Sequence, residues 1–416
     1  MSMSLRHWFD YLVVLFICGL NHSWVACQES SDTSSLAFAE SVADAKLIAI
    51  GKVPGTLRDL SGLNQQRSDG AAVDQFGGFS GIEWAGGNRY LVVPDRGFDI
   101  ESDSYWCRFH EIDIDIDFAN GTAEIVLHQS VLLTDERGNR YPGEGKWLSP
   151  SKNRAHRLDP EGIRLDVDGN IIICDEYGPY LLKFNRQGKL LTTLPVPANF
   201  EIQTPHAKGS QEDEENKQGR RSNRGLEGVA ITPSGKFLVG LMQSPLIQDS
   251  GRDENGKFHG RNVRLLKLDL QTGQQQQFVY ELEDDSHKLQ ELLAINENEF
   301  LVAEQDGDGG LKTKFKKLIR IDLSQATPLP EGTLLPPVGL PNAVIAVEKS
   351  VYLDLLSDEF GLANETMPDK IEGLSWGPWL DDNRRVLVVA SDNDFSLENP
   401  TYLFLFSVSA AKVTTD

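Results

Sequence analysis

The amino-acid sequence predicts an all-β fold, and three observations support this prediction. Apolar and polar residues alternate in short segments separated by Gly, Asn, Asp and Pro turns, which is the pattern of β-strands. Helical periodicity over ten or more residues is almost absent after the N-terminal apolar run. A similar hairpin recurs five times, and repeated antiparallel units of three or four strands are typical of a β-propeller. A two-domain β-sandwich is the competing architecture, but the regularity of the repeat favours the propeller.

Four of the five repeats open with an acidic residue, usually followed by glycine, at the start of an apolar strand, and the first repeat has a serine there instead. A tight turn follows, then a strongly apolar second strand that ends in a polar cluster, and then a third strand of alternating polarity. The five openings align at Ser80, Glu161, Glu227, Glu291 and Glu372. The long gaps after the first and fourth openings leave room for a sixth copy, so the sequence predicts five or six blades.

The segment "AKLIAIGKVPG", which begins at Ala45, is a strand-like segment that belongs to no repeat. The last repeat ends near Ser409 after three strands and has no fourth. We expect the N-terminal segment to supply this fourth strand, because that pairing closes the ring of blades and removes an exposed sheet edge. Residues 45–410 are therefore predicted to form a single β-propeller domain.

Three further segments are predicted from their composition. Residues 1–27 have a basic end, a short apolar run from Tyr11 to Leu20 and small residues after it, which is the pattern of a secretory signal peptide. Lipid modification at Cys27 is an alternative fate for this end of the chain. Residues 28–44 follow as a polar leader. Residues 205–224 contain almost nothing apolar and are predicted to form a flexible loop between two blades.

These features predict an exported protein, either periplasmic or extracellular. No other apolar segment is long enough to span a membrane. The 62 acidic and 40 basic residues give a net charge of −22, which repels nucleic acid and attracts cations. We therefore expect no nucleic-acid partner, and we expect a monomer. The four cysteines are too few for a disulfide framework; Cys107 and Cys174 are expected to be buried thiols, with one bridge as the alternative.

The repeat also predicts a cluster of carboxylates at one face. The first strand of a propeller blade lines the central channel, and in an antiparallel sheet it starts where the second strand ends. The Glu-Gly openings and the polar clusters after the second strands should therefore share one face. Like charges in this arrangement repel and need a compensating cation, a basic side chain or backbone N–H donors. Ca²⁺ is the cation that oxygen ligands of this kind suit best, with Mg²⁺ second.

Two groups of candidate site residues follow from this prediction. For any single glutamate, the alternative is a structural role in which it accepts backbone hydrogen bonds from the neighbouring blade. The candidate catalytic residues are Arg96, Glu161, Glu227 and Glu372. The candidate metal ligands are Asp95, Asp175, Glu176, Glu291, Glu304, Asp306, Asp392 and Asp394.

Several repeat motifs resemble a known family. They include "FSGIEW", "PEGIRLDVDGNIIICDEYGPYLLKFNRQGKLL", "GLEGVAITPSGKFLVGLMQSPL" and "KIEGLSWGPWLDDNRRVLVVASDNDF". The sequence is similar to the phytase-like family, also described as "esterase-like activity of phytase", over roughly residues 60 to 409. The resemblance implies an exported bacterial β-propeller that hydrolyses an ester or a phosphate ester. Calcium-dependent β-propeller phytases are similar in having an acidic, cation-lined mouth.

Three functional hypotheses remain at the level of sequence. The first is metal-assisted hydrolysis of a phosphate ester or other ester, with Arg96 binding the phosphate; a salt bridge is the alternative role for Arg96. The second is a non-catalytic ligand- or partner-binding propeller, for which Trp147 is the best contact residue. The third is a serine carboxylesterase: residues 373–377 fit G-x-S-x-G around Ser375, but the strand–turn–helix context that this motif requires is missing.

Overall fold

The structure is a computed structural model that describes residues 36–37, 44–66, 71–95, 105–143, 157–206, 208–381, 383–409 and 411–412. The predicted signal peptide, Cys27 and most of the polar leader lie outside these residues. The described residues all belong to one compact unit, Ser34–Asp416. Within them, no helix has the length and apolar character needed to cross a membrane.

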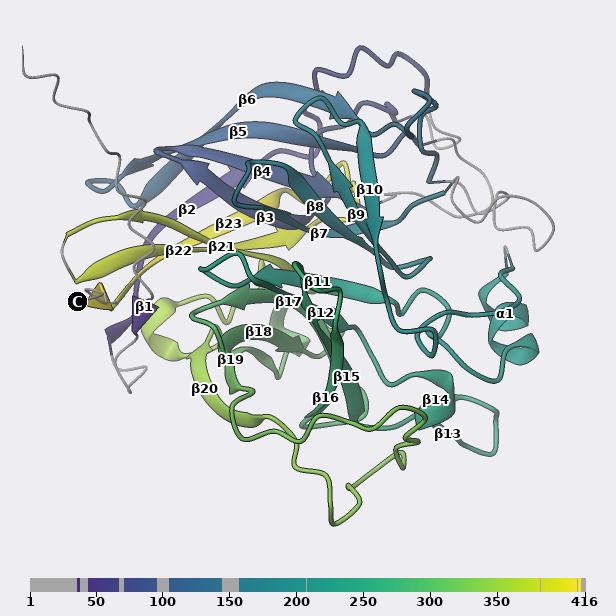
Figure 1. Cartoon of the computed structure of the whole chain (residues 1–416). Coiled ribbons are helices and arrows are strands. Elements are labelled where there is room, and N and C mark those ends of the chain that lie inside the picture. Colours follow the sequence, from purple (N-terminus) through teal and green to yellow (C-terminus); the bar gives the residue numbers. More distant parts are fainter. Residues whose placement is uncertain are drawn as a thin grey trace, which may run out of the picture. The chain divides into compact units, whose positions relative to one another are not determined.

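Strands are the main secondary structure of the described part of the chain (Figure 1), which confirms that the fold is mostly β. Three sheets have four antiparallel strands each. The first contains β7 (Pro160–Leu165), β8 (Ile171–Asp175), β9 (Tyr180–Phe184) and β10 (Leu190–Leu194). The second contains β11 (Leu226–Ile231), β12 (Phe237–Met242), β15 (Asn262–Asp269) and β16 (Gln275–Glu281). The third contains β17 (Lys288–Ala294), β18 (Glu299–Gln305), β19 (Lys316–Asp322) and β20 (Glu348–Asp354).

An eight-stranded sheet combines the first and the last repeats. One half contains β3 (Phe79–Gly86), β4 (Arg89–Pro94), β5 (Arg108–Asp117) and β6 (Thr122–Leu132). The other half contains β21 (Lys370–Trp379), β22 (Arg384–Asp392), β23 (Thr401–Ser409) and β2 (Lys46–Val53). Strand β2 pairs antiparallel with β23, as the sequence predicts, and meets β6 in a short parallel pairing. The N-terminal strand therefore occupies the fourth position of the last repeat.

The remaining elements are short. Strand β1 (Leu36–Ala37) pairs with β24 (Ala411–Lys412), and β13 (Gly251–Arg252) pairs with β14 (Phe258–His259). Among the described residues, 3₁₀ helices cover Ile247–Asp249, Gly310–Lys312 and Asp358–Phe360. The long gap in the fourth repeat contributes only one described strand, β20, between β19 and β21.

The first strands of the repeats contact one another in a cyclic order. Strand β3 contacts β7, β7 contacts β11, β11 contacts β17, β17 contacts β21, and β21 contacts β3. Glycine makes these contacts close: a Cβ atom added to Gly228 would lie 2.7 Å from the backbone nitrogen of Leu292 in the next repeat. This explains the glycine that follows the opening glutamate.

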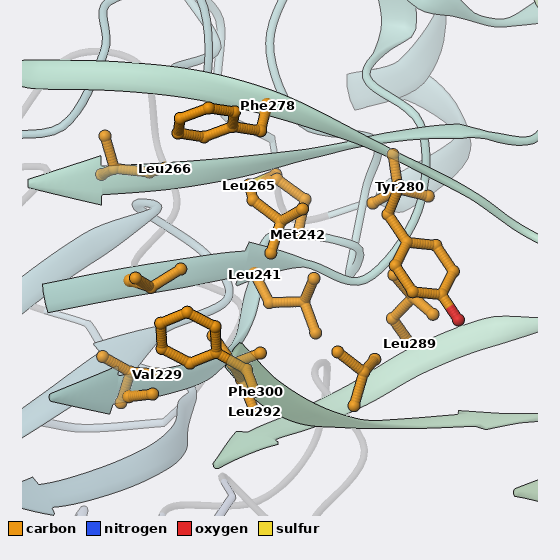
Figure 2. Close-up of a cluster of buried hydrophobic side chains, with 14 of the residues drawn as sticks. Val229, Leu241, Met242, Leu265, Leu266, Phe278, Tyr280, Leu289, Leu292 and Phe300 are labelled. Carbon is orange, nitrogen blue, oxygen red and sulfur yellow. The ribbon is translucent and has the colours of Figure 1, made fainter. Parts of the chain in front are cut away.

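Apolar side chains fill the space between successive sheets. Figure 2 shows one such cluster, in which Val229 of β11, Leu241 of β12 and Leu265 of β15 pack with Leu292 of β17 and Phe300 of β18. All five are completely buried. Burial of each side chain of this size contributes about 1.5–3 kcal/mol, so these clusters hold the sheets and their first strands in place.

The segment 205–224 differs from the predicted flexible loop, because part of it forms helix α1 (Gly209–Glu215). The buried Glu212 carboxylate forms an ion pair with the buried guanidinium of Arg220 and accepts a 2.8 Å hydrogen bond from the His206 backbone N–H. Arg220 Nε also donates to the Tyr177 carbonyl, at 2.7 Å. Polar side chains that satisfy one another take the place of an apolar face, and hydropathy alone does not reveal such pairing.

Cys107 and Cys174 are both buried free thiols. This agrees with the expected thiols, and the alternative bridge between them is absent.

Candidate metal and substrate site

The starts of the first strands surround a cavity of about 210 Å³. Its lining includes three of the predicted catalytic residues, Glu161, Glu227 and Glu372. It also includes three predicted metal ligands, Asp95, Glu176 and Asp306. Residues that are up to 277 positions apart in the chain, from 95 to 372, thus meet at one place. The common face predicted from the repeat exists for these six residues.

β-Bulges direct the glutamates toward this cavity. The pairing of each first strand with its second strand shifts register at the opening residue: between Pro160 and Ile163, between Leu226 and Gly228, and between Ile371 and Gly373. A bulge places an extra residue on one strand and re-aims its side chain. The Glu-Gly pair therefore combines a bulged glutamate that lines the cavity with a glycine that approaches the next strand.

The fourth repeat corrects the sequence alignment by one residue. In β7, two residues, 161 and 162, lie between the pairs Pro160–Asp175 and Ile163–Ile173. In β17, the two residues between Leu289–Glu304 and Leu292–Val302 are 290 and 291. Gln290, which lines the cavity, is therefore the equivalent of Glu161, and Glu291 stands at the glycine position.

Glu291 instead serves the packing of the first strands. Its Oε2 lies 3.1 Å from Nη2 of the buried Arg164, and its Oε1 accepts hydrogen bonds from the backbone N–H groups of Leu292 (2.8 Å) and Val229 (3.2 Å). Arg164 also donates to the carbonyls of Ile82 (2.9 Å) and Leu292 (2.7 Å). The pair thus ties β3, β7, β11 and β17 together and does not line the cavity.

Three buried carboxylates form the densest acidic group. One oxygen from each of Glu161, Glu176 and Glu227 lies within 4.8 Å of the others. Asp95, Asp159 and Glu161 form an overlapping group of the same kind. Glu161, Glu176 and Glu227 are only 6%, 1% and 5% exposed. Among the described residues, no group donates a hydrogen bond to Glu227 Oε2.

Burial and mutual repulsion disfavour the charged form of this group. Burial, and then the neighbouring Glu227 carboxylate, raises the pKa of Glu161 well above its usual value. Burial, followed by Glu176 and Glu372, does the same for the pKa of Glu227. Without a cation the group would take up protons, and a bound cation would replace them.

A third acidic group already contains a cation of the chain's own. Asp95, Asp392 and Asp394 also bring oxygens within 4.8 Å of one another. Lys370 Nζ lies 3.0 Å from Asp392 Oδ2 and 2.5 Å from Asp394 Oδ1. Its ammonium offsets part of the negative charge on this side of the site, so Glu161, Glu176 and Glu227 are the better position for a metal ion.

The residues present fit a hard divalent cation. Every donor in the Glu161, Glu176 and Glu227 group is a carboxylate oxygen, and Asp95 and Asp159 add oxygens next to it. Oxygen-only ligand sets suit Ca²⁺ and Mg²⁺, whereas zinc sites usually include nitrogen or sulfur. Among the described residues nothing hydrogen-bonds to Glu227 Oε2, so this oxygen keeps a lone pair available to a cation.

Two glutamine side chains orient the glutamates. Gln243 donates to Glu227 Oε1 and accepts from Arg224. Gln290 donates to Glu372 Oε1 at 2.6 Å, while Ser80 Oγ donates to Glu372 Oε2 at 3.3 Å. Burial raises the pKa of Glu372 to about 8.

Three basic residues line the same cavity: Arg224, Lys288 and Lys370. Burial, and then the nearby Arg224, lowers the pKa of Lys288. Four residues of the site were not among the candidates predicted from the sequence: Arg224, Lys288, Gln290 and Asp159. Arg224 closes the segment that was predicted to be a loop, and Lys288 precedes its repeat motif, so no repeated pattern marks either residue.

Two predicted metal ligands have other partners. Asp175 accepts hydrogen bonds from the backbone N–H groups of Asp159 (2.6 Å) and Gly178 (2.5 Å). Glu304 accepts hydrogen bonds from the Tyr280 hydroxyl (2.5 Å) and the Glu283 backbone N–H (2.8 Å), and His287 Nδ1 lies 2.9 Å from it. Neither carboxylate lines the cavity.

Of the remaining candidate site residues, one lines the cavity and two lie outside the described residues. Asp306 lines the cavity but also accepts a 2.7 Å hydrogen bond from the Lys314 backbone N–H and lies 3.1 Å from Lys316 Nζ. Arg96 and Trp147 lie outside the described residues.

The geometry of Ser375 does not support a serine esterase. Ser375 is completely buried within β21, and its Oγ donates a 2.9 Å hydrogen bond to the Trp376 carbonyl. A nucleophilic serine has to be exposed at a sharp strand-to-helix turn. Here the whole G-x-S-x-G stretch, residues 373–377, continues the strand.

Comparison with known proteins identifies the family. Residues 74–395 match the family model described as "Phytase-like: Esterase-like activity of phytase". An uncharacterized secreted protein of Arthroderma benhamiae is 29% identical over 243 residues, which cover 47% of this chain and 45% of that protein. Peptidyl-alpha-hydroxyglycine alpha-amidating lyase 2 of Drosophila melanogaster is 31% identical over 100 residues, which cover 24% of this chain and 25% of that protein. The chain thus spans less than half the length of these curated relatives.

Two solved structures are similar at 13% identity. A luciferin-regenerating enzyme aligns with 80% of both chains at a TM-score of 0.32. An ancestral GH74 enzyme aligns with 89% of this chain and 42% of its own at a TM-score of 0.38. Neither likeness is close enough to say what this chain does. The family model, in contrast, matches most of the chain, and the chain therefore belongs to the phytase-like family.

Proposed function

We propose that the chain is a hydrolase that cleaves a phosphate ester, or another ester, with the help of a divalent cation, Ca²⁺ first. The observation that carries this proposal is the composition of one cavity. Buried carboxylates and three basic side chains, Arg224, Lys288 and Lys370, line the same 210 Å³. Carboxylates can hold a cation, and the basic side chains can bind the anionic oxygens of a phosphate. Membership of the phytase-like family agrees with this chemistry.

Each residue has a proposed role. Glu161, Glu176 and Glu227, with Asp95 beside them, hold the cation, which supplies positive charge that polarises the ester oxygen. Arg224 and Lys288 bind the oxygens that face away from the cation. Glu372 is the candidate general base, because Gln290 and Ser80 fix its orientation and its pKa of about 8 is close to neutral pH.

The size of the cavity limits what enters it. Pockets for drug-sized ligands span roughly 300–1,000 Å³, so 210 Å³ suits a single ester group. A neighbouring pocket of about 780 Å³ shares Gly307 and Asp369 with the cavity. We propose that the rest of the substrate lies in this second pocket.

The test is a hydrolysis assay with p-nitrophenyl phosphate, p-nitrophenyl acetate and inositol hexakisphosphate, with Ca²⁺, with Mg²⁺ and with chelator. The proposal predicts turnover of at least one ester that chelator abolishes and added Ca²⁺ restores. The variant Glu227→Gln should lose this activity, while Glu254→Gln, an exposed glutamate in a distant turn, should retain it. No turnover under any condition would exclude the hydrolase, and an ester that binds and is recovered unchanged would favour the alternative of a non-catalytic binding propeller.

The architecture that we propose for this site is a five-bladed propeller in which β2 completes the last blade. The cyclic contacts of the five first strands and the pairing of β2 with β23 support it. We further propose that the protein is exported and monomeric. The similarity to a secreted protein supports export, while the bacterial setting stays a prediction. N-terminal sequencing of the secreted product and light scattering of the purified chain test these two points.

A further inference from the structure

A separate pocket, which shares no lining residue with the two described above and which we call the amide pocket, lies against β16 and has a volume of about 520 Å³. Four of its lining side chains are primary amides: Asn199, Gln218, Gln275 and Gln277. Pro197 and Leu329 provide apolar walls, and Glu331 is the one charged residue among those that line it. This composition is unlike that of the charged cavity described above. It points to a ligand that is neutral and forms many hydrogen bonds.

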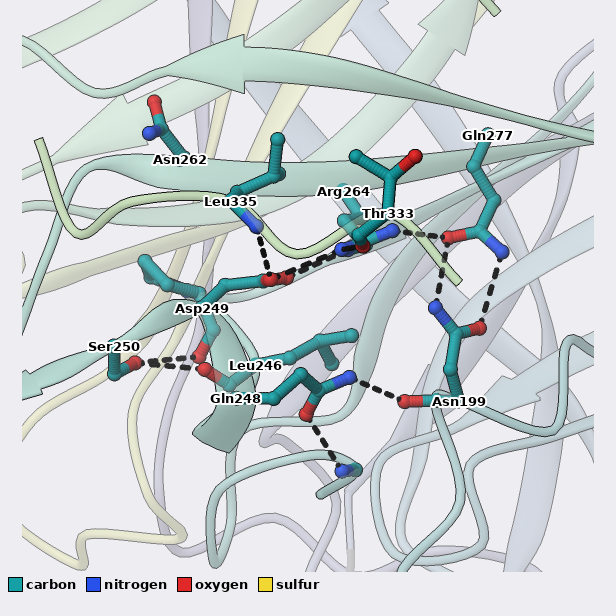
Figure 3. Close-up of polar contacts among 12 residues, drawn as sticks. Asn199, Leu246, Gln248, Asp249, Ser250, Asn262, Arg264, Gln277, Thr333 and Leu335 are labelled. Atoms are coloured by element: carbon teal, nitrogen blue, oxygen red, sulfur yellow. Dashed lines mark hydrogen bonds and ion pairs between the residues drawn. The ribbon is translucent and has the colours of Figure 1, made fainter. Parts of the chain in front are cut away.

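A hydrogen-bond network that is anchored by the buried Arg264 and Asp249 holds two side chains of the amide pocket, which form its floor (Figure 3). Arg264, which is 1% exposed, binds Asp249 through two hydrogen bonds of 2.6 and 2.9 Å and donates to the Thr333 carbonyl at 2.6 Å. Its Nη1 donates to Gln277 Oε1 at 2.9 Å. Gln277 and Asn199 then pair reciprocally, with amide–amide hydrogen bonds of 3.0 and 3.2 Å.

The loop that carries Asn199 is held as well. Gln248 Nε2 donates to the Asn199 carbonyl at 2.9 Å, and Gln248 Oε1 accepts from the Gly219 backbone N–H at 2.9 Å. The two floor amides are therefore positioned before any ligand arrives, which reduces the entropy cost of binding.

The amide groups at the floor of the pocket can still form hydrogen bonds with a ligand. A primary amide has two N–H donors and two acceptor sites. Gln277 Oε1 already accepts from both Arg264 and Asn199, so its oxygen is fully used. Within the described part of the chain, each amide nitrogen donates one hydrogen bond, the one inside the pair, and keeps one N–H. Donors and acceptors side by side match hydroxyl groups, which both donate and accept.

Strand addition by a peptide does not fit this position. The outer edge of β16 is already paired, because the backbone N–H groups of Leu329 and Val347 donate to the carbonyls of Gln277 (2.8 Å) and Val279 (2.9 Å). A ligand must therefore contact the side chains. We propose that the amide pocket binds a neutral carbohydrate through its hydroxyl groups, separately from the ester site.

The test is isothermal titration of the full chain with maltotriose, cellotriose and N,N′,N″-triacetylchitotriose, with trigalacturonic acid as the charged comparison. The proposal predicts that at least one neutral trisaccharide binds. Gln275→Ala, which removes one amide from the wall, should weaken binding about two- to tenfold, the effect of one lost hydrogen bond. Ala198→Trp, which fills the pocket without touching the network, should abolish it.

Gln276→Ala is the matched control, because Gln276 is exposed on the opposite face of the same strand and should bind like the wild type. Hydrolysis at the ester site should be unchanged in all three variants. The proposal is overturned if no neutral trisaccharide binds, if only the charged one binds, or if Ala198→Trp binds as tightly as the wild type.

Discussion

The two carboxylate oxygens of Glu227 have different surroundings, and this difference defines its role. Oε1 receives a hydrogen bond from Gln243, whereas Oε2 has no partner among the described residues. Leaving a buried polar atom unsatisfied costs about 1–3 kcal/mol. A bound cation would remove this penalty. The two oxygens of Glu372 do not differ in this way, because Gln290 donates a hydrogen bond to one and Ser80 donates a hydrogen bond to the other.

We expect Lys288 to strengthen the binding of a phosphate substrate. Its ammonium lines the cavity next to Arg224 and the carboxylates, where it can bind a substrate phosphate. A hydrogen bond to a charged group contributes about 1.5–3 kcal/mol, so Lys288→Met should raise KM for a phosphate monoester roughly ten- to a hundredfold. Steady-state kinetics measure this, with the exposed Lys257→Met as control. An unchanged KM in Lys288→Met would remove Lys288 from the proposed site.

Cavity residues that recur at one position of the repeat could be predicted from the sequence, whereas those that occur only once could not. Glu161, Glu227 and Glu372 recur at the same place in the repeat, so a topological argument reached them. Asp175 and Glu176 are neighbours at one strand end, and only the backbone decides that Glu176 lines the cavity while Asp175 binds backbone N–H groups.

At the scale of elements, the bulged first strands carry the site. Their glycines allow the close approach of neighbouring strands, and Gly228→Ala should test this. The added Cβ would lie 2.7 Å from the Leu292 nitrogen and 2.9 Å from the Glu291 Cα, both backbone atoms. Overpacking of this kind destabilises by about 1–3 kcal/mol. Denaturant unfolding should show this loss, whereas Gly307→Ala, which meets no atom within 4 Å, should leave the free energy of unfolding nearly unchanged.

Strand β2 should be necessary for the stability of the last repeat. Ala49 of β2 is 1% exposed and belongs to an apolar cluster shared with β22 and β23. Ala49→Asp would bury an unpaired charge there and should destabilise the protein by several kcal/mol. Thermal unfolding compares it with Lys52→Asp, an exposed change on the same strand. Equal Tm values for the two variants would mean that β2 contributes little.

Strand β2 and helix α1 show why some elements can be predicted from the sequence and others cannot. Strand β2 was predicted because an apolar strand without a repeat and a repeat without a fourth strand complete each other. Helix α1 was missed because its buried contacts are ionic: Glu212 and Arg220 carry charge that composition assigns to solvent.

For the molecule as a whole, the raised pKa values of buried carboxylates predict that the metal-free protein becomes less stable as the pH rises. Burial raises the pKa of Glu372 and of Glu291 to about 8. The unfolded chain releases these protons near pH 4.5, so the folded form binds more protons between the two values. The stability contributed by the raised pKa is complete below pH 4.5 and is lost as the pH rises through about 8.

This loss of stability can be separated from the effect of histidine titration. Burial lowers the pKa of His110 well below 6.5, so His110 affects stability only at pH values below about 6.5. In chelator, Tm should therefore fall between pH 6.5 and 8.5. Saturating Ca²⁺ should reduce the fall, because the cation favours the ionised carboxylates. A Tm that rises over this range in chelator would contradict the assigned shifts.

The proposed chemistry requires Glu161, Glu176 and Glu227 to hold a divalent cation in the cavity. Isothermal titration of the metal-stripped chain with Ca²⁺ tests it most directly, without any assumption about the substrate. We expect saturable binding to the wild type, and wild-type affinity in Glu254→Gln. In Glu161→Gln and Glu227→Gln we expect affinity to fall about tenfold or more, roughly 1.4 kcal/mol. Absence of binding, or equal affinity in all three variants, would contradict it.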